Sequence, residues 1–338
     1  MKPPSWGALL NRQATLLRRA AQPLRQRHQS PAGAGSWLTG AVLTTGGPRR
    51  YGLFRPDGVR FGEKLPLLVM LHGCQQDAKR FAASTRMNRL AARERFLVLY
   101  PEQPRLANAQ GCWNWFDTQG GRAWAEAAWI MRAIDQVSVL YAADRERTAV
   151  AGLSAGASMA ALLATRYPQR FKALAMHSGV PPGAASSALG AVGAMQGRRE
   201  PGVTPTDDWP PLIVIHGGQD GVVSARNAEA AVQMWSDAAG ARAGAPRELL
   251  RGKRYPMQVT EFRRRRRVVA MLVRVDRLGH AWSGGAARER FSDASGPDAS
   301  RMVWRFVEKQ FSASQSRENQ PPDRRCTGTR AIKPASSH

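Results

Sequence analysis

Short apolar runs alternate with longer amphipathic stretches through most of the chain. An apolar run of about four to eight residues is typical of a buried strand, and apolar residues at every third or fourth position predict a helix. Their alternation favours an α/β fold with a mostly parallel, doubly wound sheet. After an opening hairpin at 40–54, the expected strands are 65–72, 96–101, 147–153, 172–178 and 211–217, and the expected helices are 78–93, 123–141, 155–166 and 224–238.

Ser154 lies between the predicted strand at 147–153 and the predicted helix at 155–166, inside a Gly-Leu-Ser-Ala-Gly pentapeptide. In a nucleophile elbow the serine lies on a strained strand-to-helix turn, and Gly152 and Gly156 must lack side chains where the two elements pass close together. The alternative is a small-residue turn that packs a helix on a sheet. The flanking strand and Ala-rich helix favour Ser154 as a nucleophile.

His280 is the expected general base. It lies in a loop-like Leu-Gly-His-Ala-Trp-Ser-Gly-Gly stretch after the last predicted strand, where the chain order serine, acid, histidine of an α/β-hydrolase places the base. The other histidines lie in terminal segments or directly after apolar runs, where hydrogen-bonded structural roles are expected: His28, His338, His72, His177 and His216.

Asp220 is the expected acid, because it follows the apolar run at 211–217 and a glycine-rich turn. Its role would be to hold the His280 ring in one tautomer and to stabilise the imidazolium. Asp207 and Asp208 are rivals in a proline-rich approach to the strand. Asp276 is a third rival, but it is too close in sequence to reach around the ring easily.

Two backbone N–H groups are expected to form an oxyanion hole. Ala155 follows the nucleophile and supplies one amide. Cys74 lies in the loop after the strand at 65–72 and supplies the other, with Gly73 permitting a sharp bend. The alternative is that this His-Gly pair only ends the strand.

Five motifs in this order resemble the catalytic domain of the poly(3-hydroxybutyrate) depolymerase family of esterases. They are Leu-His-Gly-Cys-Gln-Gln at 71–76, Tyr-Pro-Glu-Gln at 100–103, Cys-Trp-Asn-Trp-Phe at 112–116, the pentapeptide at 152–156, and Gly-His-Ala-Trp-Ser-Gly-Gly at 279–285. The resemblance covers about 40–311 and is most specific in the third and fifth motifs.

The resemblance implies a serine esterase of α/β-hydrolase fold, without metal or cofactor, that cleaves 3-hydroxyalkanoate ester bonds with Ser154, Asp220 and His280. The family also contains feruloyl and acetylxylan esterases, so these substrates are an alternative. A basic granule- or envelope-binding protein with an idle hydrolase fold is an alternative of another class. Because no separate substrate-binding domain follows 311, we expect soluble oligomers or short esters as substrates.

The aromatic motifs predict substrate contacts. Trp113, Trp115 and Trp282 would supply apolar walls for the acyl chain, and Asn114 a polar contact. The alternative is that these tryptophans fill the core.

The chain is expected to have three regions: a basic amphipathic segment at 1–39, the esterase domain that the resemblance implies at 40–311, and a disordered polar tail at 312–338. Within the domain, the Ala-, Gly- and Ser-rich insertion at 181–205 is either a lid or a disordered surface loop. Two extended stretches at 257–277 flank five arginines at 263–267, which predict a solvated hairpin turn rather than a recognition patch.

The chain carries 50 basic and 25 acidic side chains, a formal charge of +25, and no acidic residue before Asp57. This excess of positive charge favours association with anionic surfaces. No nucleic-acid fold signature accompanies it, so no specific nucleic acid is expected. The segment at 1–39 has apolar residues at helical spacing with arginines between them, which fits either a membrane or granule anchor or a helix packed on the domain.

Neither a signal-peptide core nor a membrane-spanning run is visible, which leaves the compartment open although the resemblance implies an extracellular protein. Three cysteines exclude a disulfide framework and a zinc site of usual spacing. Cys74 and Cys112 fall in motifs expected near the mouth of the site, so a bridge and a pair of free thiols are both open. Cys326, in the tail, is expected to be unpaired.

Overall fold

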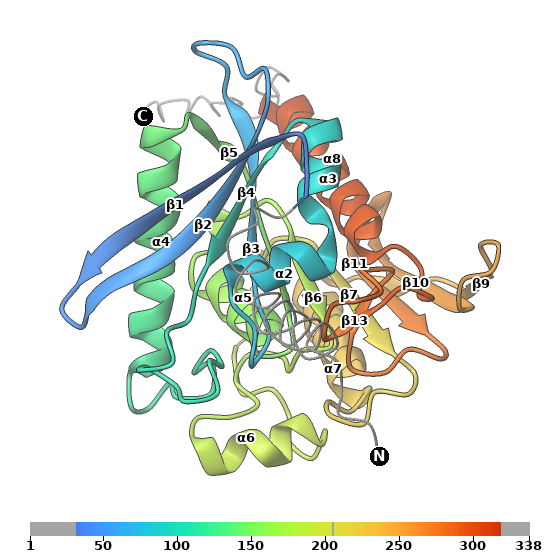
Figure 1. The fold of residues 1–338 in the computed structure, drawn as a ribbon. Coiled ribbons are helices and arrows are strands. Elements are labelled where there is room, and N and C mark those ends of the chain that lie inside the picture. The colour runs from blue at the N-terminus through green and yellow to red at the C-terminus, as the bar shows by residue number, and fades with distance from the viewer. Residues whose placement is uncertain (1–31, 205, 319–338) are drawn as a thin grey trace, which may run out of the picture.

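The computed structural model describes residues 32–204 and 206–318. These residues form a mixed sheet with helices on both faces (Figure 1). The strand order is β1-β2-β4-β3-β5-β6-β7-β11-β10-β8, and β9 pairs with β10. The strands are β1 (Gly35–Thr44), β2 (Gly47–Pro56), β3 (Leu65–Leu71), β4 (Leu97–Pro101), β5 (Ala143–Leu153), β6 (Leu174–His177), β7 (Leu212–Gly217), β8 (Arg242–Ala243), β9 (Arg247–Leu249), β10 (Met257–Arg264) and β11 (Arg267–Val275), with a separate pair β12 (Trp282–Ser283) and β13 (Ser292–Asp293).

The helices are α2 (Ala78–Thr85), α3 (Met87–Glu94), α4 (Arg122–Leu140), α5 (Ala155–Arg166), α6 (Ala188–Met195), α7 (Arg226–Ala239) and α8 (Ala299–Glu318), with a 3₁₀ turn η1 (Pro168–Arg170). Strands β4, β3, β5, β6, β7 and β11 are parallel, which confirms the mostly parallel sheet. The edges are antiparallel, because β1 and β2 form the opening hairpin and β10 and β11 form another.

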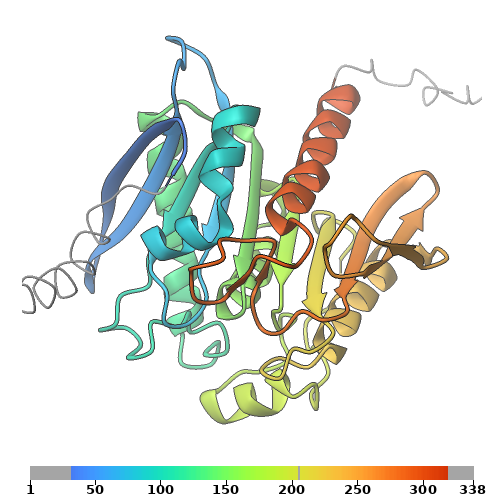
Figure 2. The ribbon, with the colours of Figure 1, turned by 45° about the vertical axis from the view of Figure 1, so that its right-hand side comes forward.

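Alternate side chains of each central strand enter two different cores. On β3, Leu67 and Val69 pack toward α4, α5 and α7, whereas Leu68 and Met70 pack toward α2, α3 and α8. Figure 2 shows α8 against the sheet together with α2 and α3. Burial on both faces explains why these strands read as continuous apolar runs.

The helix predicted at 78–93 is two helices. Arg86 has a left-handed φ of 56° and separates α2 from α3. The Thr85 hydroxyl accepts a hydrogen bond from the Met87 amide at 3.3 Å and donates to the Phe81 carbonyl at 3.0 Å. A threonine side chain therefore satisfies backbone groups where the helix is interrupted, an effect that periodicity does not register.

The insertion at 181–205 is not a structureless surface loop over its described part. Helix α6 is capped by the Ser187 hydroxyl, which accepts from the Gly190 amide. The Met195 carbonyl accepts from the Ser224 amide at 2.8 Å and from the Asn227 side chain at 3.1 Å. The insertion thus docks on the segment that follows Asp220.

Secondary structure reaches beyond both bounds expected for the esterase domain. Strand β1 begins at Gly35, before the expected start at 40, and α8 continues past 311 to Glu318. After Phe311 the helix continues with polar residues, and the Ser312 and Ser314 hydroxyls donate to carbonyls one turn back. The basic segment up to 31, with His28, and the residues from 319 on, with Cys326 and His338, lie outside the described residues.

The five-arginine run forms the hairpin turn between β10 and β11, as predicted, and its side chains are exposed. Arg265 takes a left-handed φ of 54° there. Within the part of the chain that the structure describes, no helix combines the length and the apolar character needed to cross a bilayer.

Candidate active site

Ser154 lies between β5 and α5 with φ 56° and ψ −124°. A non-glycine residue in this region is strained and persists only where its surroundings enforce it. A Cβ on Gly152 would lie 2.3 Å from the Gly156 carbonyl oxygen, and a Cβ on Gly156 would lie 2.1 Å from the Leu71 carbonyl oxygen. The two glycines therefore let α5 cross the ends of β5 and β3 at backbone contact, as an elbow requires.

Asp220 and His280 meet in a hydrogen bond of 2.8 Å between Asp220 Oδ2 and His280 Nδ1. Asp220 Oδ1 accepts from the amides of Val222 and Val223, both at 2.9 Å. Burial alone would raise the pKa of Asp220, but the bonds from His280 and the two amides lower it to about 2. The carboxylate is therefore charged at neutral pH although its side chain has no exposed surface.

The rival acids are placed elsewhere: Asp207, Asp208 and Asp276 are exposed, and none has a hydrogen bond to His280 among the described residues.

The segment before His280 is fixed to the segment before Asp220 by backbone contacts. The Gln219 amide donates to the Leu278 carbonyl at 3.0 Å. A Cβ on Gly217 would lie 2.2 Å from the same carbonyl oxygen. The close approach holds acid and base in register without a side chain between them.

His177 connects the nucleophile elbow to the His280 loop, a link that the sequence did not reveal. Its carbonyl accepts from the Ser154 amide at 2.9 Å, and its ring Nε2 accepts from the Ser283 amide at 3.2 Å. Its ring stacks on Trp282 with 5.1 Å between centroids. Burial, with smaller contributions from His216 and His280, lowers the pKa of His177 to about 3, so the ring is a neutral acceptor. The only sequence signal was its place at a strand end.

Around Gly73, hydrogen bonds hold the loop after β3 in one shape. The Gly73 amide donates to Gln76 Oε1 at 3.0 Å, and His72 Nδ1 donates to the Gly73 carbonyl at 2.8 Å. His72 Nε2 in turn accepts from the Gln103 amide at 3.1 Å. A Cβ on Gly73 would lie 3.6 Å from Ser154 Cβ, so this loop borders the serine.

The amides of Cys74 and Ala155 donate to no other protein group among the described residues. Cys74 follows the fixed Gly73, and Ala155 is the first residue of α5, where amides lack partners within the helix. Both N–H groups therefore remain available to a ligand beside Ser154.

Cys74 and Cys112 form a disulfide that closes a 38-residue separation, which settles the choice left open by the sequence. The bridge ties the loop after β3 to the Cys-Trp-Asn-Trp-Phe motif. In the chain-entropy model such a closure contributes about 4 kcal/mol.

Three of the four predicted substrate contacts are core residues instead. Trp113 is fully buried and donates through Nε1 to the His72 carbonyl at 3.0 Å. Trp282 is 1% exposed and donates to the Ser300 hydroxyl at 3.1 Å. Asn114 is also 1% exposed, so none of the three offers surface to an acyl chain. Trp115, which is 7% exposed and packs edge-on against Phe116, retains a small accessible area.

Glu126 on α4 explains why Asn114 is buried. Its carboxylate accepts from the Asn114 amide at 2.8 Å, from the Asn114 side chain at 2.5 Å and from Gln103 Nε2 at 2.6 Å. Burial raises the pKa of Glu126, while these hydrogen bonds oppose the rise. This network orders the connection between β4 and α4, which carries Cys112. Gln103 and Asn114 belong to two of the motifs, but no motif had indicated Glu126.

The sheet order and the strained serine at a strand-to-helix turn place the molecule among the α/β-hydrolases. Within that class the chain belongs to the family described as "Esterase PHB depolymerase", whose family model matches residues 49–251.

Relatives of several activities share this region. A "Poly(3-hydroxyalkanoate) depolymerase C" from Paucimonas lemoignei is 32% identical over 51% of this chain and 44% of its own. A "Feruloyl esterase B" from Neurospora crassa is 28% identical over 55% of this chain and 68% of its own. A "Probable acetylxylan esterase A" from Aspergillus fumigatus is 30% identical over 35% of this chain and 31% of its own. The aligned region thus spans less than half of the depolymerase.

Solved structures support the fold. An acetyl xylan esterase from Aspergillus awamori superposes with a TM-score of 0.57 and 18% identity, covering 72% of this chain and 94% of that one. A ferulic acid esterase from Anaeromyces mucronatus superposes with a TM-score of 0.52 and 13% identity, covering 84% of this chain and 94% of that one.

Proposed function

We propose that the chain is a serine carboxylic-ester hydrolase whose triad is Ser154, Asp220 and His280. The observation that carries the proposal is the hydrogen bond between the buried, charged Asp220 and His280 Nδ1, which leaves Nε2 of the ring free to act as a base. The elbow presents Ser154 at the carboxyl ends of the same parallel strands.

The reaction proceeds in two balanced halves. Ser154 Oγ attacks the ester carbonyl while His280 takes its proton, and the Cys74 and Ala155 amides bind the oxyanion. Collapse expels the alcohol, which receives the proton from His280, and leaves an acyl-Ser154 ester. Water then attacks this ester with His280 again as base, releasing the carboxylic acid and restoring the serine.

The proposed substrates are poly- or oligo-3-hydroxybutyrate and related hydroxyalkanoate esters, supported by the name of the Paucimonas lemoignei relative. Feruloyl and acetylxylan esters are the second candidate, favoured by the fungal relatives. We also propose that the basic segment at 1–31 attaches the enzyme to a granule or anionic membrane, on the basis of its sequence pattern alone.

A substrate panel tests the proposal. Purified protein is assayed on hydroxybutyrate oligomers, amorphous polymer, ethyl ferulate and acetylated xylan, with Ser154→Ala and His280→Ala as matched variants. We expect hydroxybutyrate oligomers to give the highest kcat/KM and each variant to lose about 10³-fold or more, without additive losses in the double variant. Undiminished turnover by Ser154→Ala would refute the serine mechanism, and an idle fold would show no turnover on any ester.

A further inference from the structure

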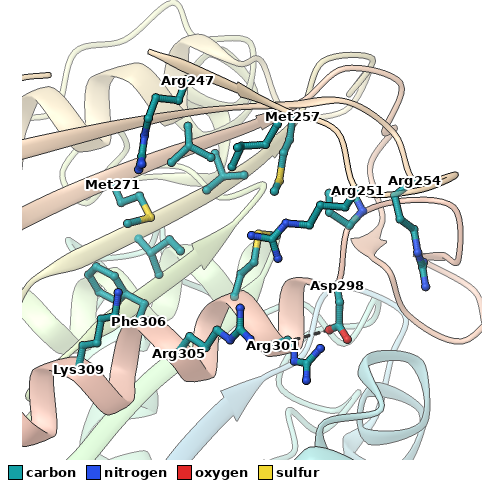
Figure 3. Close-up of a pocket in the computed structure, with 16 residues that line it drawn as sticks. Arg247, Arg251, Arg254, Met257, Met271, Asp298, Arg301, Arg305, Phe306 and Lys309 are labelled. Carbon is teal, nitrogen blue, oxygen red and sulfur yellow. Dashed lines mark hydrogen bonds between the residues drawn. The ribbon is translucent and has the colours of Figure 1, made fainter. Parts of the chain in front are cut away.

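A cavity that does not include Ser154 lies on the face of the sheet that α8 covers. It has a volume of about 470 Å³ and opens between α8 and the sheet edge formed by β7, β11, β10 and β9 (Figure 3). This volume falls in the usual range for small-molecule pockets. Its walls share no residue with the proposed triad, oxyanion hole or disulfide.

The floor of this cavity is apolar. Side chains from the strands and from α8 meet there, and several of them are almost fully buried. They are Ile213, Leu249, Met257, Val259, Met271, Val273, Met302 and Phe306. Such a floor suits a hydrocarbon chain, since removing apolar surface from water is favourable.

The rim of the cavity is cationic. Arg301, Arg305 and Lys309 recur at every fourth residue of α8, and Arg251 faces them from the loop between β9 and β10. Figure 3 shows Arg251 and Arg305 pointing from opposite sides into the cavity. Like charges spaced four apart on a helix repel each other, so the row is unfavourable without an anion.

These four cations have no carboxylate partner among the described residues. Arg247, also on the rim, pairs with Glu261 at 3.0 Å, and Arg254 donates to backbone carbonyls, so both are already engaged. The one acidic lining residue, Asp298, caps α8 by accepting from the Arg301 amide at 2.9 Å. The cavity therefore combines an apolar floor with a rim where cationic side chains outnumber the one carboxylate.

We infer that this cavity is a second binding site for a single-chain amphipathic anion, with the acyl chain on the apolar floor and a carboxylate or phosphate head on the rim arginines. Guanidinium groups suit both heads because they donate paired N–H bonds to two oxygens. The site stands whether or not Ser154 is a nucleophile.

Calorimetric titration with defined probes tests the site. Decanoate and decyl phosphate separate the two heads, inorganic phosphate supplies a head alone, and decanol supplies a tail alone. We expect one or both amphiphiles to bind at least about tenfold more tightly than either fragment.

Three variants locate that binding. Arg301→Gln/Arg305→Gln should weaken it about tenfold or more by removing charged donors, and Met271→Trp should weaken it by filling the floor. Arg132→Gln on α4, which packs on the other core, is a control for the loss of an exposed arginine elsewhere and should bind as the wild type does. All variants should keep the wild-type turnover of a soluble short ester, which also verifies folding.

The inference is overturned if neither amphiphile binds, if the double arginine variant binds as tightly as Arg132→Gln, or if decanol binds as tightly as the anions. A loss of esterase activity in Ser154→Ala with unchanged amphiphile binding supports both proposals separately.

Discussion

The carboxylate of Asp220 accepts three hydrogen bonds, one from His280 and two from the amides of Val222 and Val223. Its pKa of about 2 lies below the ordinary value of 3.8. A lowered pKa contributes stability that is complete above the unfolded-state value and is lost as the pH falls through the folded-state value. Ionisation of Asp220 thus links its proposed catalytic role to the stability of the protein in acid.

We expect the melting temperature of the wild type to fall more steeply between pH 5 and pH 2 than that of Asp220→Asn, which has no charge to lose there. Calorimetry across this range measures both slopes. Asp276→Asn, a change at an exposed aspartate, serves as control and should keep the wild-type slope. Equal slopes for wild type and Asp220→Asn would contradict the assigned pKa shift.

His177 is expected to position the His280 loop without touching substrate. His177→Phe preserves an aromatic face toward Trp282 but leaves the Ser283 amide without its acceptor, which should lower kcat about tenfold with little change in KM. His177→Gln retains an acceptor and should restore part of kcat. If both variants lose only stability and keep kcat, the residue is merely part of the core.

At the scale of elements, the crossing of α5 over β3 and β5 depends on glycine. Gly156→Ala should lower the free energy of unfolding by about 4 kcal/mol or more, because the new methyl group meets the Leu71 carbonyl at 2.1 Å. Gly221→Ala is the control, since no atom lies within 4 Å of the added carbon. Urea unfolding measures the free energy of unfolding of both variants. If Gly156→Ala is as stable as Gly221→Ala, α5 can shift away from β3.

The disulfide is expected to stabilise the loop after β3, which carries Cys74. Cys74→Ser and Cys112→Ser should lose stability equally, by about 4 kcal/mol, and the double variant should lose no more than either single one. Cys326→Ser controls for thiol loss elsewhere. Unequal effects of the first two variants, measured by urea unfolding, would show that one cysteine matters for packing rather than for the bridge.

Much of this fold could be predicted because central strands buried on both faces have unmistakable apolar runs. The elbow and the Asp220–His280 pair followed from chain order and strand ends. The break at Arg86 could not be predicted, because it depends on a local hydrogen bond to the Thr85 hydroxyl that periodicity does not register. The network around Glu126 could not be predicted either, because it joins α4 to residues of the preceding connection through side-chain hydrogen bonds. The prediction that Trp113 and Trp282 contact substrate was wrong, because both side chains are buried and have polar hydrogen-bond partners inside the core.

For the whole molecule, the net charge of +25 predicts adsorption to anionic particles. Deleting residues 1–31 removes six basic side chains. We expect this deletion to abolish co-sedimentation with anionic vesicles or polyester granules while turnover of a soluble ester is unchanged. Binding by the full chain should weaken with salt, because charge attraction is screened within about 8 Å at physiological ionic strength. If the shortened protein sediments as the full chain does, the folded domain and not the segment at 1–31 contacts the particles.

The chain has three cysteines, and oxidation can join them as Cys74–Cys112, Cys74–Cys326 or Cys112–Cys326. Only the first pairing matches the folded structure. The native disulfide must therefore form in preference to the two other pairings. During synthesis Cys74 and Cys112 are made first, and Cys326 follows as a competing thiol. A cell that keeps thiols reduced would accumulate the unbridged form, and one that oxidises them without an isomerase would trap mispaired chains. The yield of active protein should then depend on the host's redox machinery as much as on its growth temperature.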